Sequence, residues 1–118
     1  MNAEELRART KNLAVRIVEM VERLPRTIGS DVMGKQLIRS ATSVAANYRA
    51  VGRARSRADF INKLGIVVEE ADETLFWLEM LIDLKKVKEA DVKDIVGETK
   101  EIVAIFTAAH KTARTNRK

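Results

Sequence analysis

The chain has 118 residues, of which 22 are Lys or Arg, 17 are Asp or Glu, one is His and none is Cys, for a formal net charge of +5. A chain of this length forms one domain, and its lack of cysteine excludes disulfides, thiolate zinc sites and thiol catalysis. No stretch approaches the roughly 20 apolar residues of a membrane span, and the N-terminal residues are too polar for a signal sequence. We therefore expect a cytoplasmic protein with no membrane partner.

The first two predicted helices cover residues 3–24 and 31–53 approximately. Pro25 ends the first helix, because the residue before a proline is pushed out of the helical conformation. Ser30 or Asp31 is the expected N-cap of the second helix. Apolar residues recur at helical spacing on one face of the first helix (Leu6, Leu13, Ile17, Met20, Leu24) and of the second (Met33, Leu37, Ala41, Val44, Tyr48, Val51).

The third predicted helix covers residues 57–84 and has the most regular pattern. Ser56 followed by Asp59 resembles a capping box, in which the hydroxyl accepts a backbone N–H and the carboxylate reaches back to the cap. The expected buried stripe is Phe60, Leu64, Val67, Ala71, Leu75, Leu78 and Ile82.

The fourth predicted helix covers residues 91–114, is capped near Asp91 and repeats Ile95, Ile102, Phe106, Ala109 and Ala113. No strand alternation competes with these four helices. Short connections between helices of similar length imply antiparallel neighbours. The sequence therefore predicts an all-α protein with one domain over residues 1–118, an antiparallel up-down-up-down four-helix bundle.

Several apolar side chains fall outside the stripes that would close a monomeric bundle. Single exposed apolar residues are ordinary on protein surfaces, whereas contiguous ones mark an interface. We expect a second copy of the chain to cover them, with the alternative that Trp77 lies at the edge of the core. The expected interface residues are Val15, Val18, Phe76, Trp77 and Met80.

The residues for catalysis or metal binding are missing from the sequence. A di-iron bundle needs Glu-x-x-His pairs, but the only histidine, His110, has no carboxylate three or four positions before it. Nucleophilic catalysis would need Ser40, Ser43 or Ser56 beside a base, and no nucleophile-elbow sequence is present. We expect a protein that is not an enzyme, with no catalytic residue, no metal and no cofactor.

Charge is segmented along the chain. Seven basic residues and one acidic residue between positions 35 and 63 give +6, whereas five basic and eleven acidic residues between 64 and 101 give −6. Arginine offers planar, two-pronged donors that suit phosphates, so the basic segment predicts a surface that follows a nucleic-acid backbone. Its expected residues are Lys35, Arg39, Arg49, Arg53, Arg55 and Arg57, which the tail residues Lys111, Arg114, Arg117 and Lys118 would extend.

Four segments of the chain resemble the proteins encoded in bacterial 23S rRNA intervening sequences. The segments are QLIRSATSVAANYRA (residues 36–50), RARSRADFINKL (53–64), EEADET (69–74) and WLE (77–79). The resemblance implies an antiparallel bundle and a ring-shaped homopentamer. It also extends to the accessory variability proteins of diversity-generating retroelements, which implies binding to RNA or DNA and to a reverse transcriptase.

Two hypotheses of function follow. In the first, a homo-oligomeric bundle binds the backbone of RNA or DNA through the basic face. In the second, the chain is a protein-interaction scaffold without nucleic-acid affinity, whose arginines dock on the acidic helix of a neighbouring subunit or on another protein.

Overall fold

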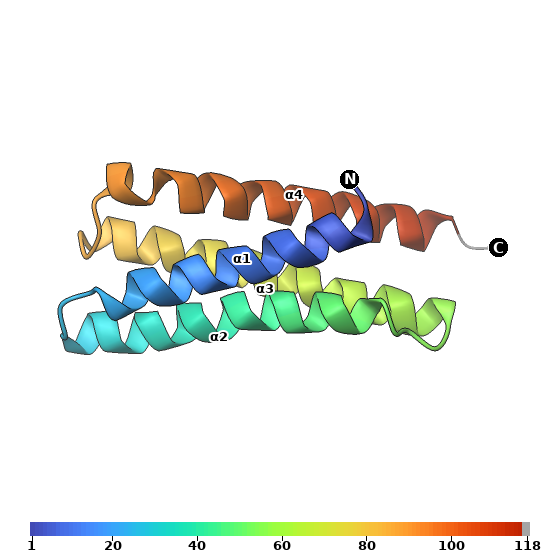
Figure 1. Cartoon of the computed structure of the whole chain (residues 1–118), viewed down its shortest axis with the longest axis horizontal. Coiled ribbons are helices and arrows are strands. Elements are labelled where there is room, and N and C mark those ends of the chain that lie inside the picture. The colour runs from blue at the N-terminus through green and yellow to red at the C-terminus, as the bar shows by residue number, and fades with distance from the viewer. Residues whose placement is uncertain (117–118) are drawn as a thin grey trace.

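The computed structural model describes residues 1–116, which fold into four long helices in an elongated bundle measuring 51 × 21 × 21 Å (Figure 1). Successive helices run in opposite directions, and the described residues contain no strand. The predicted all-α four-helix bundle is confirmed. The elements are α1 (Ala3–Glu22), α2 (Ile28–Val51), α3 (Arg57–Asp83), the 3₁₀ turn η1 (Glu89–Val92) and α4 (Lys93–Thr115).

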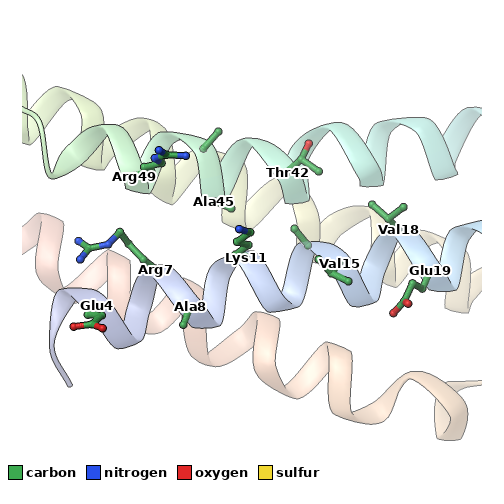
Figure 2. A pocket seen from close by; sticks show the side chains of 12 residues that line it. Glu4, Arg7, Ala8, Lys11, Val15, Val18, Glu19, Thr42, Ala45 and Arg49 are labelled. Carbon is green, nitrogen blue, oxygen red and sulfur yellow. The ribbon is translucent and has the colours of Figure 1, made fainter.

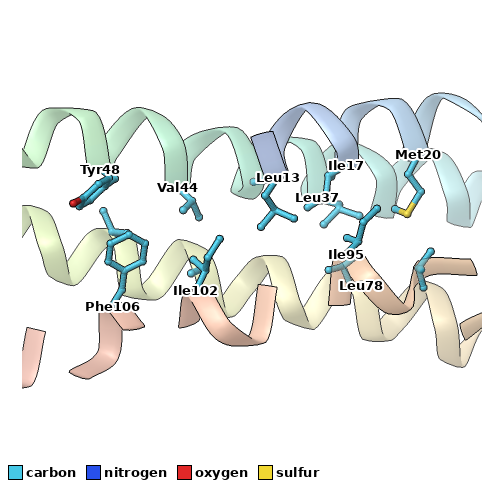
Figure 3. Close-up of a cluster of buried hydrophobic side chains, with 14 of the residues drawn as sticks. Leu13, Ile17, Met20, Leu37, Val44, Tyr48, Leu78, Ile95, Ile102 and Phe106 are labelled. Carbon is cyan, nitrogen blue, oxygen red and sulfur yellow. The ribbon is translucent and has the colours of Figure 1, made fainter. Parts of the chain in front are cut away.

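One apolar core runs along the whole bundle axis, and all four helices contribute to it (Figure 3). Ile17, Leu37, Leu78 and Ile102 are fully buried. Near the end where α2 finishes, the rings of Tyr48 and Phe106 pack at a centroid distance of 4.8 Å. Burial of these side chains fixes how each helix is rotated about its own axis.

The buried face of α3 differs from the predicted stripe. It consists of Ile61, Leu64, Val67, Ala71, Thr74, Leu78 and Leu81. Phe60, predicted to be buried, is 38% exposed, and Leu75 and Ile82 are only partly buried. Thr74 takes a core position because its hydroxyl is satisfied: Oγ1 lies 2.8 Å from the Glu70 carbonyl and 3.0 Å from Ser40 Oγ.

Side-chain caps begin three of the helices, and for α1 the Asn2 side chain accepts a hydrogen bond from the Glu5 N–H at 2.8 Å. The Ser56 hydroxyl accepts a hydrogen bond from the Asp59 N–H at 3.1 Å, as predicted, while the Asp59 carboxylate accepts from the Arg55 N–H at 3.0 Å. For α2 the predicted cap was wrong. The helix begins at Ile28 because Thr27 is the N-cap, its hydroxyl accepting from the Ser30 N–H at 3.1 Å.

Arg9 ties α1 to α4 and so closes the bundle. Its Nε donates to Glu98 Oε2 at 2.9 Å, and its Nη2 lies 3.1 Å from Glu101 Oε1. The hydrogen bond from Arg9 lowers the pKa of Glu98 below its ordinary value.

A close approach of α1 and α2 at Gly34 gives a test of the packing. A Cβ at this position would lie 2.7 Å from Val21 Cγ1, so Gly34→Ala forces a short, stiff side chain to move. We expect this variant to lose about 1 kcal/mol of unfolding free energy in denaturant titrations, despite the better helix propensity of alanine. Gly97→Ala is the matched control: a Cβ there meets nothing within 4 Å, and the variant should gain up to about 1 kcal/mol. Equal gains from both variants would contradict the packing of α1 on α2.

Candidate nucleic-acid interface

The six basic residues predicted to form one surface are divided by the fold. Lys35 lies near the start of α2, on the rim of a surface hollow that Val21 and Ile38 also line. Arg49 lies about four turns further along the same helix. Arg39, between them, is engaged within the chain, so the row is interrupted.

Arg39 forms a forked ion pair with α3. Its Nη1 and Nη2 donate to the Glu70 carboxylate at 3.0 and 3.1 Å, and Nη2 also donates to Glu73 Oε1 at 2.7 Å. The same Glu73 oxygen accepts from Trp77 Nε1 at 3.1 Å, and Ser43 donates to Glu70 at 2.9 Å. The hydrogen bonds from Arg39 and Trp77 lower the pKa of Glu73 below its ordinary value. We call these five residues the Arg39 network.

Arg57 is engaged at the other end of the chain. Its guanidinium donates to the carbonyl of Ala113 at 3.2 Å and to the carbonyl of Asn116. These carbonyls lie at the end of α4, where unsatisfied oxygens and the helix dipole favour a cation. Arg57 therefore closes α4 onto the start of α3.

Arg49, Arg53 and Arg55 form the cationic cluster. With Asp59 and Lys63 they line a surface hollow of about 480 Å³ where α2 ends and α3 begins. Lys63 Nζ donates to Asp59 Oδ1 at 2.6 Å, and this bond, followed by that from the Arg55 N–H, lowers the pKa of Asp59. Within residues 1–116 the three guanidinium groups have no ion-pair partner.

Arg7 and Lys11 on α1 lie beside the cationic cluster, and sequence reasoning missed them. Both line a groove between α1 and α2 that also contains Arg49 (Figure 2). Arg7 Nη1 is 3.9 Å from the point that a Cβ on Gly52 would occupy, so it reaches the end of α2. Their spacing of four residues was visible in the sequence, but only antiparallel packing brings them to Arg49.

The tail residues that were expected to extend the basic face fall into two groups. Lys111 and Arg114 are exposed near the end of α4, and Arg117 and Lys118 lie outside the described residues.

The predicted interface residues lie on two separate surfaces. Val15, 50% exposed, and Val18, half-buried, line the groove between α1 and α2. Phe76, 49% exposed, lies on α3 with Trp77 and Met80, both half-buried. The rings of Phe76 and Trp77 pack edge to face at a centroid distance of 4.9 Å. That these residues form an interface stays a prediction.

The residues considered for catalysis have structural contacts. Ser40 is buried with its hydroxyl 3.2 Å from the Leu37 carbonyl, Ser43 belongs to the Arg39 network, and Ser56 caps α3. His110 lies against Gly65 of α3, with Nε2 3.1 Å from the point that a Cβ there would occupy. Among residues 1–116 no three His, Cys, Asp or Glu side chains are grouped as metal ligands.

The fluorescence of Trp77, the one tryptophan of the chain, reports on the Arg39 network. Because the pKa of Glu73 is lowered, its carboxylate stabilises the fold above pH 4.5, and this contribution is lost as the pH falls through the folded pKa. We expect Trp77 fluorescence to change with a midpoint below 4.5 and Arg39→Gln to move that midpoint upward. Circular dichroism must show an intact helix content over the same pH range. A midpoint unchanged by Arg39→Gln would contradict the network.

Comparison with known proteins relates the chain to one family. The model of the 23S rRNA-intervening sequence protein family matches residues 4–108. A crystal structure of a protein with unknown function from the S23 ribosomal protein family of Bacteroides thetaiotaomicron is 38% identical, with a TM-score of 0.85. The match covers 94% of this chain and 99% of that one.

No curated protein matches the chain, and no enzymatic family is indicated. Among the described residues no helix is long and apolar enough to cross a membrane. The match extends over nearly the whole bundle, including α2 and α3 with the cationic cluster. The chain belongs to the 23S rRNA-intervening sequence protein family.

Proposed function

We propose that the chain is a non-enzymatic homo-oligomeric bundle that binds the backbone of RNA or DNA through the cationic cluster. The observation that carries the proposal is the unbalanced charge of the hollow between α2 and α3. It gathers Arg49, Arg53, Arg55 and Lys63 around a single carboxylate, that of Asp59. Such a concentration of cations is stabilised by a polyanion, and phosphates are the anions that arginine matches best.

The position of the cluster supports an external anion. Arg53 and Arg55 immediately precede α3, a helix of 27 residues whose N-terminal N–H groups carry partial positive charge. The same two arginines also follow the C-terminal end of α2, which favours cations, and Asp59 is the one carboxylate that lines the hollow. A phosphate bound at the start of α3 would therefore meet arginines that have no ion-pair partner in residues 1–116.

The chemistry of the hollow favours the backbone over the bases. Arg49 lies in the last turn of α2 and Arg53 follows the end of the helix, and the small side chains of Ala46 and Ala50 line the hollow beside them. The residues that line the hollow include no aromatic side chain on which a base could stack. Contacts to phosphates position a protein without reading sequence. The family name refers to 23S rRNA, which makes RNA the first ligand to test.

The second candidate function is a scaffold that binds another protein, such as the reverse transcriptase that the resemblance implies, and no nucleic acid. The exposed Phe76 and the adjacent Trp77 favour it, because aromatic residues are enriched at the centres of protein interfaces. The scaffold predicts no measurable RNA or DNA affinity at about 0.15 M salt.

Binding of fluorescently labelled RNA and DNA duplexes, measured by anisotropy over a salt series, tests the proposal. We expect the double variant Arg53→Gln/Arg55→Gln to weaken binding and to lower the slope of log affinity against log salt by about one for each phosphate that the variant no longer neutralises. The effect should be similar across nucleotide sequences, since the arginines bind phosphates.

The matched control is Arg23→Gln/Lys35→Gln, which removes the same charge from exposed positions at the far end of the bundle. This control should leave the salt slope unchanged. Equal losses of affinity from both pairs would mean that net charge, and not the cationic cluster, determines binding. Absence of binding by the wild type would refute the proposal and favour the scaffold.

A further inference from the structure

A buried hydroxyl without a partner lies at the end of the bundle opposite the cationic cluster. Ser30, in the first turn of α2, is only 3% exposed, and its Oγ makes no hydrogen bond within residues 1–116. Four other buried serine and threonine hydroxyls, those of Thr10, Ser40, Thr74 and Thr99, each donate to a backbone carbonyl. An unsatisfied buried hydroxyl costs free energy that alanine would avoid, so the Ser30 hydroxyl calls for a partner from outside the chain.

Ser30 lines a hollow between the end of α1 and the start of α2, which we call the Ser30 hollow. Its volume is about 340 Å³, within the range of small-molecule sites. Val21, Leu24 and Ile38, all half-buried, form an apolar wall. The hollow therefore combines an apolar surface with a buried hydrogen-bonding group, as sites for small amphipathic molecules do.

The charges that line the Ser30 hollow sum to zero. Arg26 Nε donates to Asp31 Oδ1 at 2.8 Å, so these two side chains neutralise each other. Glu22 and Lys35 are exposed and have no ion-pair partner within residues 1–116. One free charge of each sign matches a ligand that carries one charge of each sign better than a simple anion or cation.

We propose that the Ser30 hollow binds a free α-amino acid with a small aliphatic side chain. The carboxylate of the ligand accepts a hydrogen bond from the Ser30 hydroxyl and pairs with Lys35, and the positive end of the α2 dipole favours it there. The ammonium group pairs with Glu22. The aliphatic side chain contacts the apolar wall, which favours a branched chain over a polar one.

This inference does not rest on nucleic-acid binding. The Ser30 hollow shares no residue with the hollow of the cationic cluster. Arg53→Gln/Arg55→Gln should therefore leave amino-acid binding unchanged, and the two proposals can fail separately.

Titration of the wild-type protein with L-leucine, followed by the amide signals in ¹H–¹⁵N NMR spectra, tests the site. We expect saturable shifts that centre on Val21, Ser30 and Ile38, with a Kd of about 1 mM or tighter. No saturable shift at leucine concentrations up to about 10 mM would overturn the proposal, and so would shifts centred elsewhere on the bundle.

Ser30→Ala tests the role of the hydroxyl. We expect leucine to bind about tenfold more weakly, while the melting temperature of the free protein does not fall, because the hydroxyl has no hydrogen bond to lose. The matched control is Ser40→Ala, which removes a buried hydroxyl that donates to the Leu37 carbonyl and accepts from Thr74. This control should melt at a lower temperature and bind leucine like the wild type.

Two outcomes for Ser30→Ala would contradict the site. Unchanged leucine binding would mean that the hydroxyl does not contact the ligand. A melting temperature as low as that of Ser40→Ala would mean that the hydroxyl is already satisfied in the free protein.

Analogues of leucine that lack one charge test the zwitterion. 4-Methylpentanoate lacks the ammonium group and 3-methylbutylamine lacks the carboxylate, and each should bind about fivefold more weakly than leucine. Glu22→Gln should abolish the preference for leucine over 4-methylpentanoate, and Lys35→Gln the preference over 3-methylbutylamine. Equal binding of leucine and either analogue to the wild type would overturn the assignment of an amino acid.

Discussion

Burial of one apolar face on each helix is the constraint on which the rest of the molecule depends. A helix that turns Thr74 and Leu78 inward must turn Glu70, Glu73 and Trp77 toward α2 and Phe76 toward solvent. The Arg39 network and the exposed ring of Phe76 are thus consequences of the same packing. The core determines the rotation of α3, and the rotation determines which charges and aromatic rings are available outside.

The bundle could be predicted from the sequence because it depends on local signals. The stripe of α1 needs only the spacing of its own residues, and the Ser56 cap needs only a residue three positions away. The inward position of Thr74 could not be predicted in this way, since apolarity alone favours Leu75. Thr74 is buried because hydrogen bonds to Glu70 and Ser40 satisfy its hydroxyl, and the second of these crosses between helices.

The candidate site was harder to predict, because a charge count does not say which charges are already paired. Arg39 and Arg57 count as basic residues of the same segment as Arg53. They nevertheless bind groups that lie 31 to 59 positions away along the chain. Arg7 lies far from this segment in the sequence, and only the packing of α1 against α2 brings its guanidinium to the end of α2. Pairing across helices depends on their relative register, and one sequence carries little information about register.

The acidic residues of α3 divide into two groups, which the net charge does not distinguish. Glu70 and Glu73 neutralise Arg39 within the chain, whereas Asp72 and Glu79 have no ion-pair partner among the described residues. Removing Arg39 from the basic face leaves the unpaired arginines at one end of the bundle, beside the groove rather than along the whole of α2. A homo-oligomer of the proposed kind would then present one cationic cluster for each copy. Several clusters held at fixed spacing bind a long polyanion more tightly than one cluster does, because each additional contact is intramolecular. Self-association would in this way turn a small patch on each chain into a continuous surface for a nucleic-acid backbone.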